Sequence, residues 1–142
     1  MSIKTDLRGH LAANAGVAAI TTRISLSRSN ESDALPRITV HQIGGDHKHH
    51  TLAATGRAFG RFQIDCHADT PIGADTLAEA VRQSLDGFRG TMNAGTFVCK
   101  CHLDDERTAY TPPHPGKNES GGVDTIQLDY LFGWNVSVPT FA

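Results

Sequence analysis

The sequence predicts an α+β fold: a mostly antiparallel sheet of about five strands, with two helices packed on one face, in the order α-β-β-β-α-β-β. Two segments, residues 3–14 and 71–88, repeat apolar side chains every three or four positions, as amphipathic helices do. Several other segments alternate apolar and polar side chains, which is typical of half-buried strands. Strands that follow one another through short or hairpin-like links favour antiparallel pairing.

Size and charge narrow the class of protein. A chain of 142 residues has the size of one domain, so we expect residues 1–142 to form a single domain with its own core. The net charge of −2 provides no basic surface for sequence-independent nucleic-acid binding. No apolar run is long enough to span a bilayer, and the N-terminus lacks the apolar segment of a signal peptide. The odd number of cysteines, three, predicts reduced thiols in a cytosolic setting.

The N-terminal part is predicted to hold one helix and one short strand. Ile3, Leu7 and Leu11 follow helical spacing, which predicts a helix over residues 3–14. Apolar residues then alternate with polar ones over residues 24–26, which predicts a short strand.

The next part of the chain is predicted to be a loop, a strand and a polar connection. Residues 27–36 are rich in turn formers and are expected to be an exposed loop. Residues 37–43 are β-branched and alternating, which predicts a second strand. Residues 44–56 are polar and rich in histidine, and we interpret them as a connection or as a long hairpin whose strands extend into it.

The central segment, residues 57–90, joins a strand directly to a helix. Apolar side chains alternate with polar ones up to Cys66, and the spacing of apolar residues then becomes helical. Thr70 is a good helix N-cap, and Pro71 suits the first helical position because its missing N–H would be unpaired there.

The C-terminal part is predicted to hold two strands separated by a loop. Residues 97–104 alternate, with Cys99 and Cys101 on the apolar face. Residues 105–122 contain three prolines and three glycines and are predicted to form a long flexible loop. Residues 126–138 have the clearest alternation in the chain and predict a last strand, which is a candidate sheet edge.

Metal binding is one alternative that the residue types raise. His47, His49 and His50 are grouped in GGDHKHH, and histidine and cysteine are the ligands that zinc prefers. Cys99 and Cys101 have C-x-C spacing, which is not the spacing of a zinc knuckle, and both are expected on an apolar strand face. We therefore predict no metal site and no cofactor, and keep the three histidines as the alternative.

Catalysis is a second alternative. Asp104, Asp105, Glu106 and His114 are acidic and basic groups close together in the sequence. General acid–base catalysis needs such groups held rigidly within hydrogen-bond reach, whereas these lie at a strand end and in a loop rich in proline and glycine. The chain has no G-x-S-x-G, P-loop or G-x-G-x-x-G motif. We therefore predict a solvated charged turn and a protein that is not an enzyme, with no catalytic residues.

An assembly surface is the interpretation that remains. Connections as long as residues 44–56 and 105–122 commonly serve recognition. The candidate surface residues are the charged, histidine and aromatic side chains in and beside these two segments: His47, His49, His50, Asp104, Asp105, Glu106, Arg107, Tyr110, His114 and Lys117.

Several fragments together resemble a known family. In order they are SIKTDLRGHLAANAGVAAI, LPRITVHQIGG, FGRFQIDCHADTPIGADTLAEAVRQSLDGFRGT, FVCKCHLDDERTAYTPP and DTIQLDYLFGW. This series resembles the tail completion, or head–tail joining, proteins of long-tailed bacteriophages and prophages, which are similar to tail terminators. The histidine-rich segment and residues 136–142 depart from the family pattern.

The resemblance implies a structural role at the head–tail junction of a virion, for a protein made in the host cytoplasm. Such proteins form a ring, commonly a hexamer, that stops growth of the tail tube and faces the head connector. The implied partners are further copies of the chain, the tube protein and the connector or neck protein, with DNA only passing through the channel and no membrane involved. A neck adaptor that binds the head connector is the alternative role. The sheet edges and residues 44–56 are expected to make the ring contact, and Asp104, Asp105 and Glu106 to face the channel.

Overall fold

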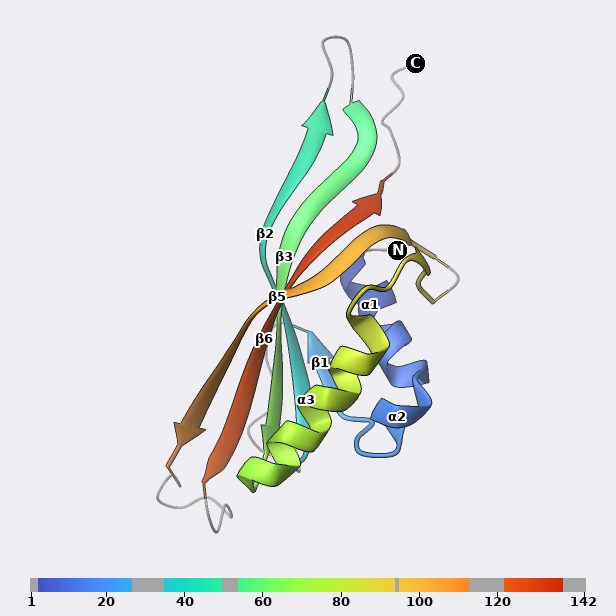
Figure 1. Cartoon of the computed structure of the whole chain (residues 1–142). Coiled ribbons are helices and arrows are strands. Elements are labelled where there is room, and N and C mark those ends of the chain that lie inside the picture. Colours follow the sequence, from blue (N-terminus) through green and yellow to red (C-terminus); the bar gives the residue numbers. More distant parts are fainter. Residues whose placement is uncertain (1–2, 27–34, 50–53, 94, 113–121, 137–142) are drawn as a thin grey trace.

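Over the residues that the structure describes, the fold is a curved six-stranded sheet with three helices on one face (Figure 1). The computed structural model of the chain describes residues 3–26, 35–49, 54–93, 95–112 and 122–136. None of the helices in these ranges is long and apolar enough to cross a membrane. In chain order the elements are α1 (Ile3–Ala13), α2 (Ala15–Ala18), β1 (Ile24–Leu26), β2 (Arg37–His49), β3 (Ala54–Ala68), α3 (Pro71–Leu85), β4 (Gly90–Thr91), β5 (Phe97–Thr111) and β6 (Val123–Asn135).

The strand order is β1-β2-β3-β6-β5-β4, with β1 parallel to β2 and every other neighbouring pair antiparallel. The predicted α+β class and mostly antiparallel sheet are confirmed, but the described residues alone contain one strand and one helix more than predicted. Asn14 starts a separate helix, because its side chain accepts a hydrogen bond from the Val17 backbone N–H at 3.1 Å. β4 is only two residues long, too short to show an alternating pattern.

The segment that the sequence presented as a polar connection is largely strand. β2 continues through residues 44–49 and β3 already begins at Ala54, so the interpretation as a long hairpin is the correct one. The register shifts between Gln42 and Gly44, which marks a β-bulge. Figure 1 shows this end of the hairpin extending past the helices, which explains why its composition is polar.

The predicted loop over residues 105–122 is wrong for residues 105–111, which continue β5 as far as Thr111. Thr111 pairs with Val123 at the start of β6, and the side chains of residues 104–111 are all exposed. The apolar alternation fades there because no helix covers this part of the strand, while backbone pairing with β6 still holds it. Residues 113–121 lie outside the described residues.

β6 lies in the middle of the sheet, so the expectation that it forms an edge is wrong. It pairs with β3 along one side and with β5 along the other. Its alternation is the clearest in the chain because one face of a central strand is buried along most of its length. The strand also begins and ends about three residues earlier than predicted, at Val123 and Asn135.

The long helix α3 begins as its local sequence predicts and ends at Leu85, three residues before the end of the segment with helical spacing. The Thr70 side chain accepts a hydrogen bond from the Gly73 backbone N–H at 3.0 Å, and Pro71 occupies the first turn. After the helix, Gly87 has a φ of +80°, a conformation that glycine adopts without steric cost. The Gly87 N–H donates to the Cys101 carbonyl of β5 at 2.9 Å, which ties the end of the helix to the sheet.

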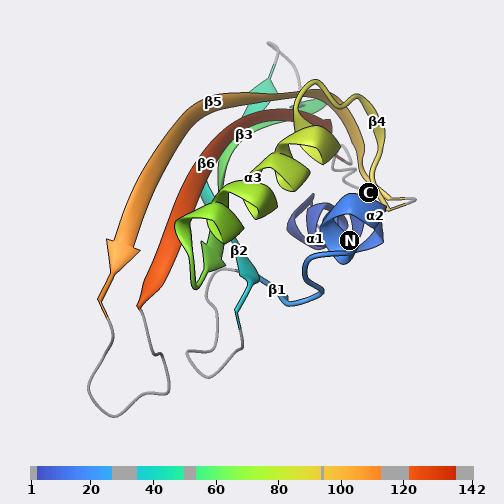
Figure 2. The same ribbon diagram turned by 60° about the horizontal axis from the view of Figure 1, so that its bottom comes forward.

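The core lies between the sheet and the helices, beneath the arch that β5, β6 and β3 form over α3 in Figure 2. Phe62 makes edge contacts with Phe132 and Trp134, with ring centroids 5.0 and 5.8 Å apart. Leu77 and Leu85 of α3 are fully buried on the opposite side of this core. Burial of each such side chain contributes about 1.5–3 kcal/mol to folding.

α1 is anchored to the turn before β5 by a buried acid. The Asp6 side chain is fully buried, and its Oδ2 accepts hydrogen bonds from the backbone N–H of Thr96, at 2.9 Å, and from the Thr96 hydroxyl. A Cβ at Gly95 would lie 2.6 Å from Asp6, so glycine is required for this close approach. Periodicity in the sequence gave no signal of this contact between residues ninety positions apart.

Candidate assembly surface

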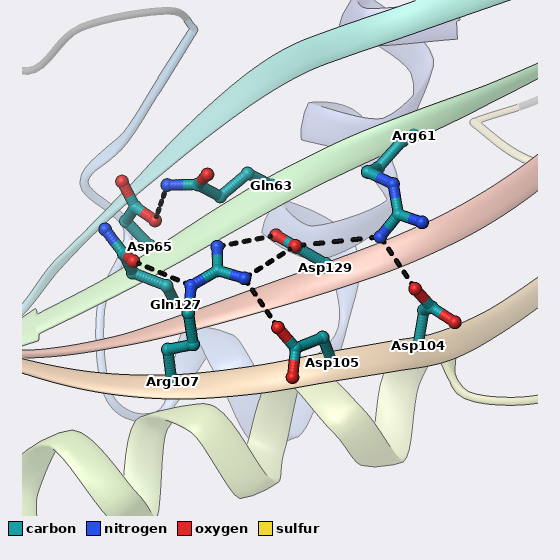
Figure 3. Close-up of polar contacts among 8 residues, drawn as sticks. All are labelled: Arg61, Gln63, Asp65, Asp104, Asp105, Arg107, Gln127 and Asp129. Atoms are coloured by element: carbon teal, nitrogen blue, oxygen red, sulfur yellow. Dashed lines mark hydrogen bonds and ion pairs between the residues drawn. The ribbon is translucent and has the colours of Figure 1, made fainter.

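A group of charged side chains lies on the face of the sheet opposite the helices (Figure 3). Three adjacent strands contribute, because the register places Asp129 of β6 opposite Gln63 of β3 and also opposite Asp105 of β5. We use the name charged cluster for the five side chains that form ion pairs there: Arg61, Asp104, Asp105, Arg107 and Asp129.

Arg107 and Asp129 form the centre of the charged cluster. The Arg107 Nη1 and Nη2 atoms donate to the two carboxylate oxygens of Asp129 at 2.9 and 3.2 Å, a bidentate arrangement. Nη1 also lies 2.6 Å from Oδ2 of Asp105. The hydrogen bonds to Asp129 and then to Asp105 raise the pKa of the Arg107 guanidinium, so Arg107 stays charged.

Arg61 extends the charged cluster across the strands. Its Nη1 lies 2.7 Å from Oδ2 of Asp104 and 3.7 Å from Oδ2 of Asp129. The Asp129 side chain is only 7% exposed, whereas that of Arg61 is 37% exposed. Exposed ion pairs contribute about 0–1 kcal/mol, so the buried carboxylate of Asp129 is the member whose partners matter most.

A row of polar side chains continues this face toward β2. The Gln63 side chain donates to Oδ1 of Asp65 at 2.8 Å, and Nε2 of His41 lies 3.3 Å from Oδ2 of Asp65. Further along β3, the two ring nitrogens of His67 lie 2.8 Å from the Thr125 hydroxyl and 3.3 Å from the Thr39 hydroxyl.

The pKa of His67 is lowered to about 4, first by burial and then by the nearby Arg37 charge. The imidazole is therefore neutral at pH 7. A neutral ring can accept at one nitrogen and donate at the other, which suits its position between two hydroxyl groups.

The arrangement suits a fixed charged surface better than acid–base chemistry. Each arginine of the charged cluster is bonded to two aspartates, so the carboxylates serve as ion-pair partners across neighbouring strands. Three carboxylates face two guanidinium groups, so the charged cluster carries a net negative charge. Among the residues that the structure describes, no group of three or more His, Cys, Asp or Glu side chains could hold a metal ion.

The structure brings together only some of the residues predicted for the assembly surface. Asp104, Asp105 and Arg107 belong to the charged cluster, so the predicted charged turn is in fact a paired strand. Glu106 and Tyr110 lie on the same strand and are exposed.

The histidines of the predicted surface lie elsewhere. His47 is exposed on β2, which is separated from β5 by β3 and β6. His49 belongs to β2, but its side chain is outside the description. His50, His114 and Lys117 are outside the described residues as well. The assembly role of all these residues stays a prediction.

The prediction that Cys99 and Cys101 share an apolar face is wrong. Cys101 pairs with Phe132 and is buried in the core. The register shifts between Val98 and Lys100, and this bulge places Cys99 on the other face, where a Cβ at Gly133 would lie 3.2 Å from its sulfur. Burial raises the pKa of the thiols of Cys66 and Cys101, which is the behaviour of small core residues.

Two members of the charged cluster, Arg61 and Asp129, were missed by sequence reasoning. Each occupies a polar position in an alternating strand, which is ordinary for a solvent-facing residue. A possible signal was the presence of opposite charges on the outward faces of several strands. That signal becomes useful only when the strand order is known, because β3 and β6 are far apart in the sequence.

Comparison with known proteins identifies a family and a related fold. The family model for the tail completion protein gp17 matches residues 5–115. A solved structure described as the virion of a native gene transfer agent (GTA) particle contains a similar chain, with a TM-score of 0.66 and 16% identity. The match covers 94% of this chain and 95% of the other, so the likeness extends over nearly the whole fold. No curated protein matches the chain.

Proposed function

The chain belongs to the family of the tail completion protein gp17, and on this premise we propose that it closes the end of a phage tail tube as a homo-oligomeric ring. The observation that carries the proposal is the family match over residues 5–115, which includes most of α1, all of α3 and the strands β1 to β5. The role is structural: the ring stops growth of the tube and presents a surface to the connector of the head.

A closed ring needs a heterologous interface, in which one patch of a subunit meets a different patch of the next. The sheet supports this arrangement because its two edges differ. The edge with β1 and β2 carries the long polar hairpin, and the edge with β5 and β4 carries the acidic strand β5. Neighbouring copies can then join in one direction around the ring. The number of subunits we propose is six, which follows from the family resemblance.

The face of the sheet opposite the helices is the surface that we propose faces the channel. Asp104, Asp105 and Asp129 give this region an excess of negative charge over Arg61 and Arg107, whereas Glu106, expected from the sequence to share this surface, lies on the helix side of the sheet. Like charge lets DNA pass without adhering. The ion pairs of the charged cluster hold these carboxylates in place, so they form a fixed lining rather than a mobile one.

The experiment is electron microscopy of particles made by a phage or prophage from which the gene has been deleted. We expect overlong tails, or tails of normal length without heads, and restoration of joined particles when the wild-type gene is supplied. A variant with Ile72→Lys, a change at a fully described residue of α3 that is 77% exposed, is the control for a neutral surface change. Joined particles of normal tail length in the absence of the gene would contradict the proposal.

A further inference from the structure

In the described part of the molecule, β2 and β5 each have a stretch that pairs with a neighbouring strand on one side only. β1 pairs with β2 only at residues 38–40, and β4 pairs with β5 only at residues 97–98. The end of α3 covers the next part of β5, since Gly87 N–H donates to the Cys101 carbonyl and Leu103 N–H donates to Oδ1 of Asp86 at 3.2 Å. Residues 41–47 of β2 and 104–111 of β5 therefore have a described strand on one side only (Figure 1).

The backbone groups that point away from the sheet can be assigned on β5. Successive residues of a strand direct their N–H and C=O groups to opposite sides. Leu103 N–H points away from β6, toward Asp86, and the bulge at Asp104 then sets the register so that Asp105 faces Asp129. The outward backbone groups on β5 accordingly include those of Glu106 and Thr108.

The same assignment can be made on β2. Ile38 N–H donates to the Arg23 carbonyl at 2.9 Å, on the side of β1 and away from β3. Alternation, with the bulge between Gln42 and Gly44, leaves three residues beyond β1 whose backbone groups point outward. These residues are Gln42, Gly45 and His47.

Neither edge is protected by shortness or by proline, two of the features that guard an open strand, although each carries a bulge. Here both open stretches are long and free of proline, and each carries an exposed large apolar side chain: Ile43, at 51% exposure, and Tyr110, at 56%. An open edge of this kind is a site for pairing with another strand.

We propose that residues 104–111 of β5 in one copy pair with residues 41–47 of β2 in the next copy, so that the sheet continues through the ring. The proposal rests on the ring of the proposed function and specifies its interface. Within one copy β5 runs opposite to β2, because the three pairings between them are all antiparallel. Copies related by rotation about an axis along the strands keep these directions, so the new pairing is antiparallel too.

The side chains along the two edges fit each other. This favours a second copy of the chain as the partner strand and indicates how the two strands are aligned. His47 pairs with buried Ala58, and Glu106 pairs with buried Leu128, so both side chains lie on the helix side of the sheet. In a continued sheet they can stand directly opposite each other. A neutral histidine can donate a hydrogen bond to a carboxylate, and a protonated one adds opposite charge.

The first test removes one outward N–H. Wild type, Thr108→Pro and Thr108→Ala are each added to tail tubes made without this protein, and capping is scored by electron microscopy and native mass spectrometry. Proline at an edge position removes an outward donor and leaves the ladder to β6 intact, whereas alanine keeps the donor. We expect Thr108→Pro to weaken ring formation about fivefold or more per joint, and Thr108→Ala to match wild type.

The outcomes separate this inference from the proposed function. If Thr108→Pro has a native circular dichroism spectrum and caps tubes as well as wild type does, the edge pairing is wrong while the ring stands. If wild type itself forms no ring on the tubes, the proposed function is wrong. If Thr108→Pro does not fold, a second test on charge decides the matter.

The second test reverses charges across the proposed joint. Glu106→Lys alone and His47→Glu alone are each expected to weaken ring formation about three- to tenfold, and the double variant to recover most of the loss. The same reversal at Asp75→Lys, an exposed acid on α3, is the control and is expected to have no effect. Two additive losses without recovery in the double variant would overturn the register and with it the pairing.

Discussion

The two faces of the central sheet are held by different interactions. The face toward the helices is packed by large apolar side chains, with Phe62, Phe132 and Trp134 in direct ring contact. The opposite face is held by ion pairs and hydrogen bonds around Asp129. The first face accounts for the fold, since burial of apolar area is the main favourable term in folding. The second face carries a set of ion pairs that packing of the core alone does not require.

The comparison indicates that the two faces have different roles. A packed apolar face tolerates little change in volume, so it is suited to holding one scaffold. A face of paired charges presents fixed positive and negative groups to whatever lies beyond it, which agrees with the channel-facing position that we propose for it. Two substitutions and one change of pH test this difference between the faces.

The largest effect is expected at the buried acid of the outer face. Asp129→Ala removes the bidentate partner of Arg107, and we expect the free energy of unfolding to fall by about 1–3 kcal/mol. Asp104→Ala, which removes an exposed partner of Arg61, is the matched control, with an expected loss of about 0–1 kcal/mol. Urea unfolding monitored by circular dichroism measures both. Equal losses would mean that burial of Asp129 has no special importance.

An intermediate effect is expected from acid at His67, also on the outer face. Its pKa in the folded protein is about 4, whereas the unfolded chain has the ordinary value of about 6.5, so the unfolded state binds the proton more readily between these values. The stabilisation is complete above pH 6.5 and is lost as the pH falls toward 4.

We expect this loss to be about 1–2 kcal/mol, allowing for solvent screening of a half-buried ring. His67→Gln should flatten the dependence of the unfolding free energy on pH across that window relative to wild type. An unchanged slope in the variant would assign the acid sensitivity to other groups.

The smallest effect is expected on the packed face, at Tyr130. Its side chain is fully buried, its hydroxyl has no hydrogen-bond partner in the described structure, and burial raises the pKa of the phenol. Tyr130→Phe removes a buried polar atom without changing the ring, so we expect the unfolding free energy to stay the same or to rise by about 1 kcal/mol. Thermal unfolding would show this as an equal or higher Tm. A clear fall would reveal a partner for the hydroxyl.

Much of the local structure could be predicted because it depends on neighbouring residues. The helical spacing of Leu7 and Leu11 and the cap at Thr70 are local properties, and the structure confirms them. The extension of β5 past Asp104 could not be predicted, because its stability comes from pairing with β6 and its own side chains carry no apolar alternation. The bulge that separates Cys99 from Cys101 was hidden for a similar reason, since strand parity assumes an unbroken register.

Residue patterns were enough to predict the class of the fold, the position of most elements and, through the resemblance, the family that the comparison then confirmed. The strand order, with β6 at the centre, and the meeting of Arg61, Arg107 and Asp129 on one face become visible only in the folded chain. The physical reason is the range of each signal. Periodicity and capping act within a few residues, whereas strand order and ion pairs join segments that only the folded chain brings together.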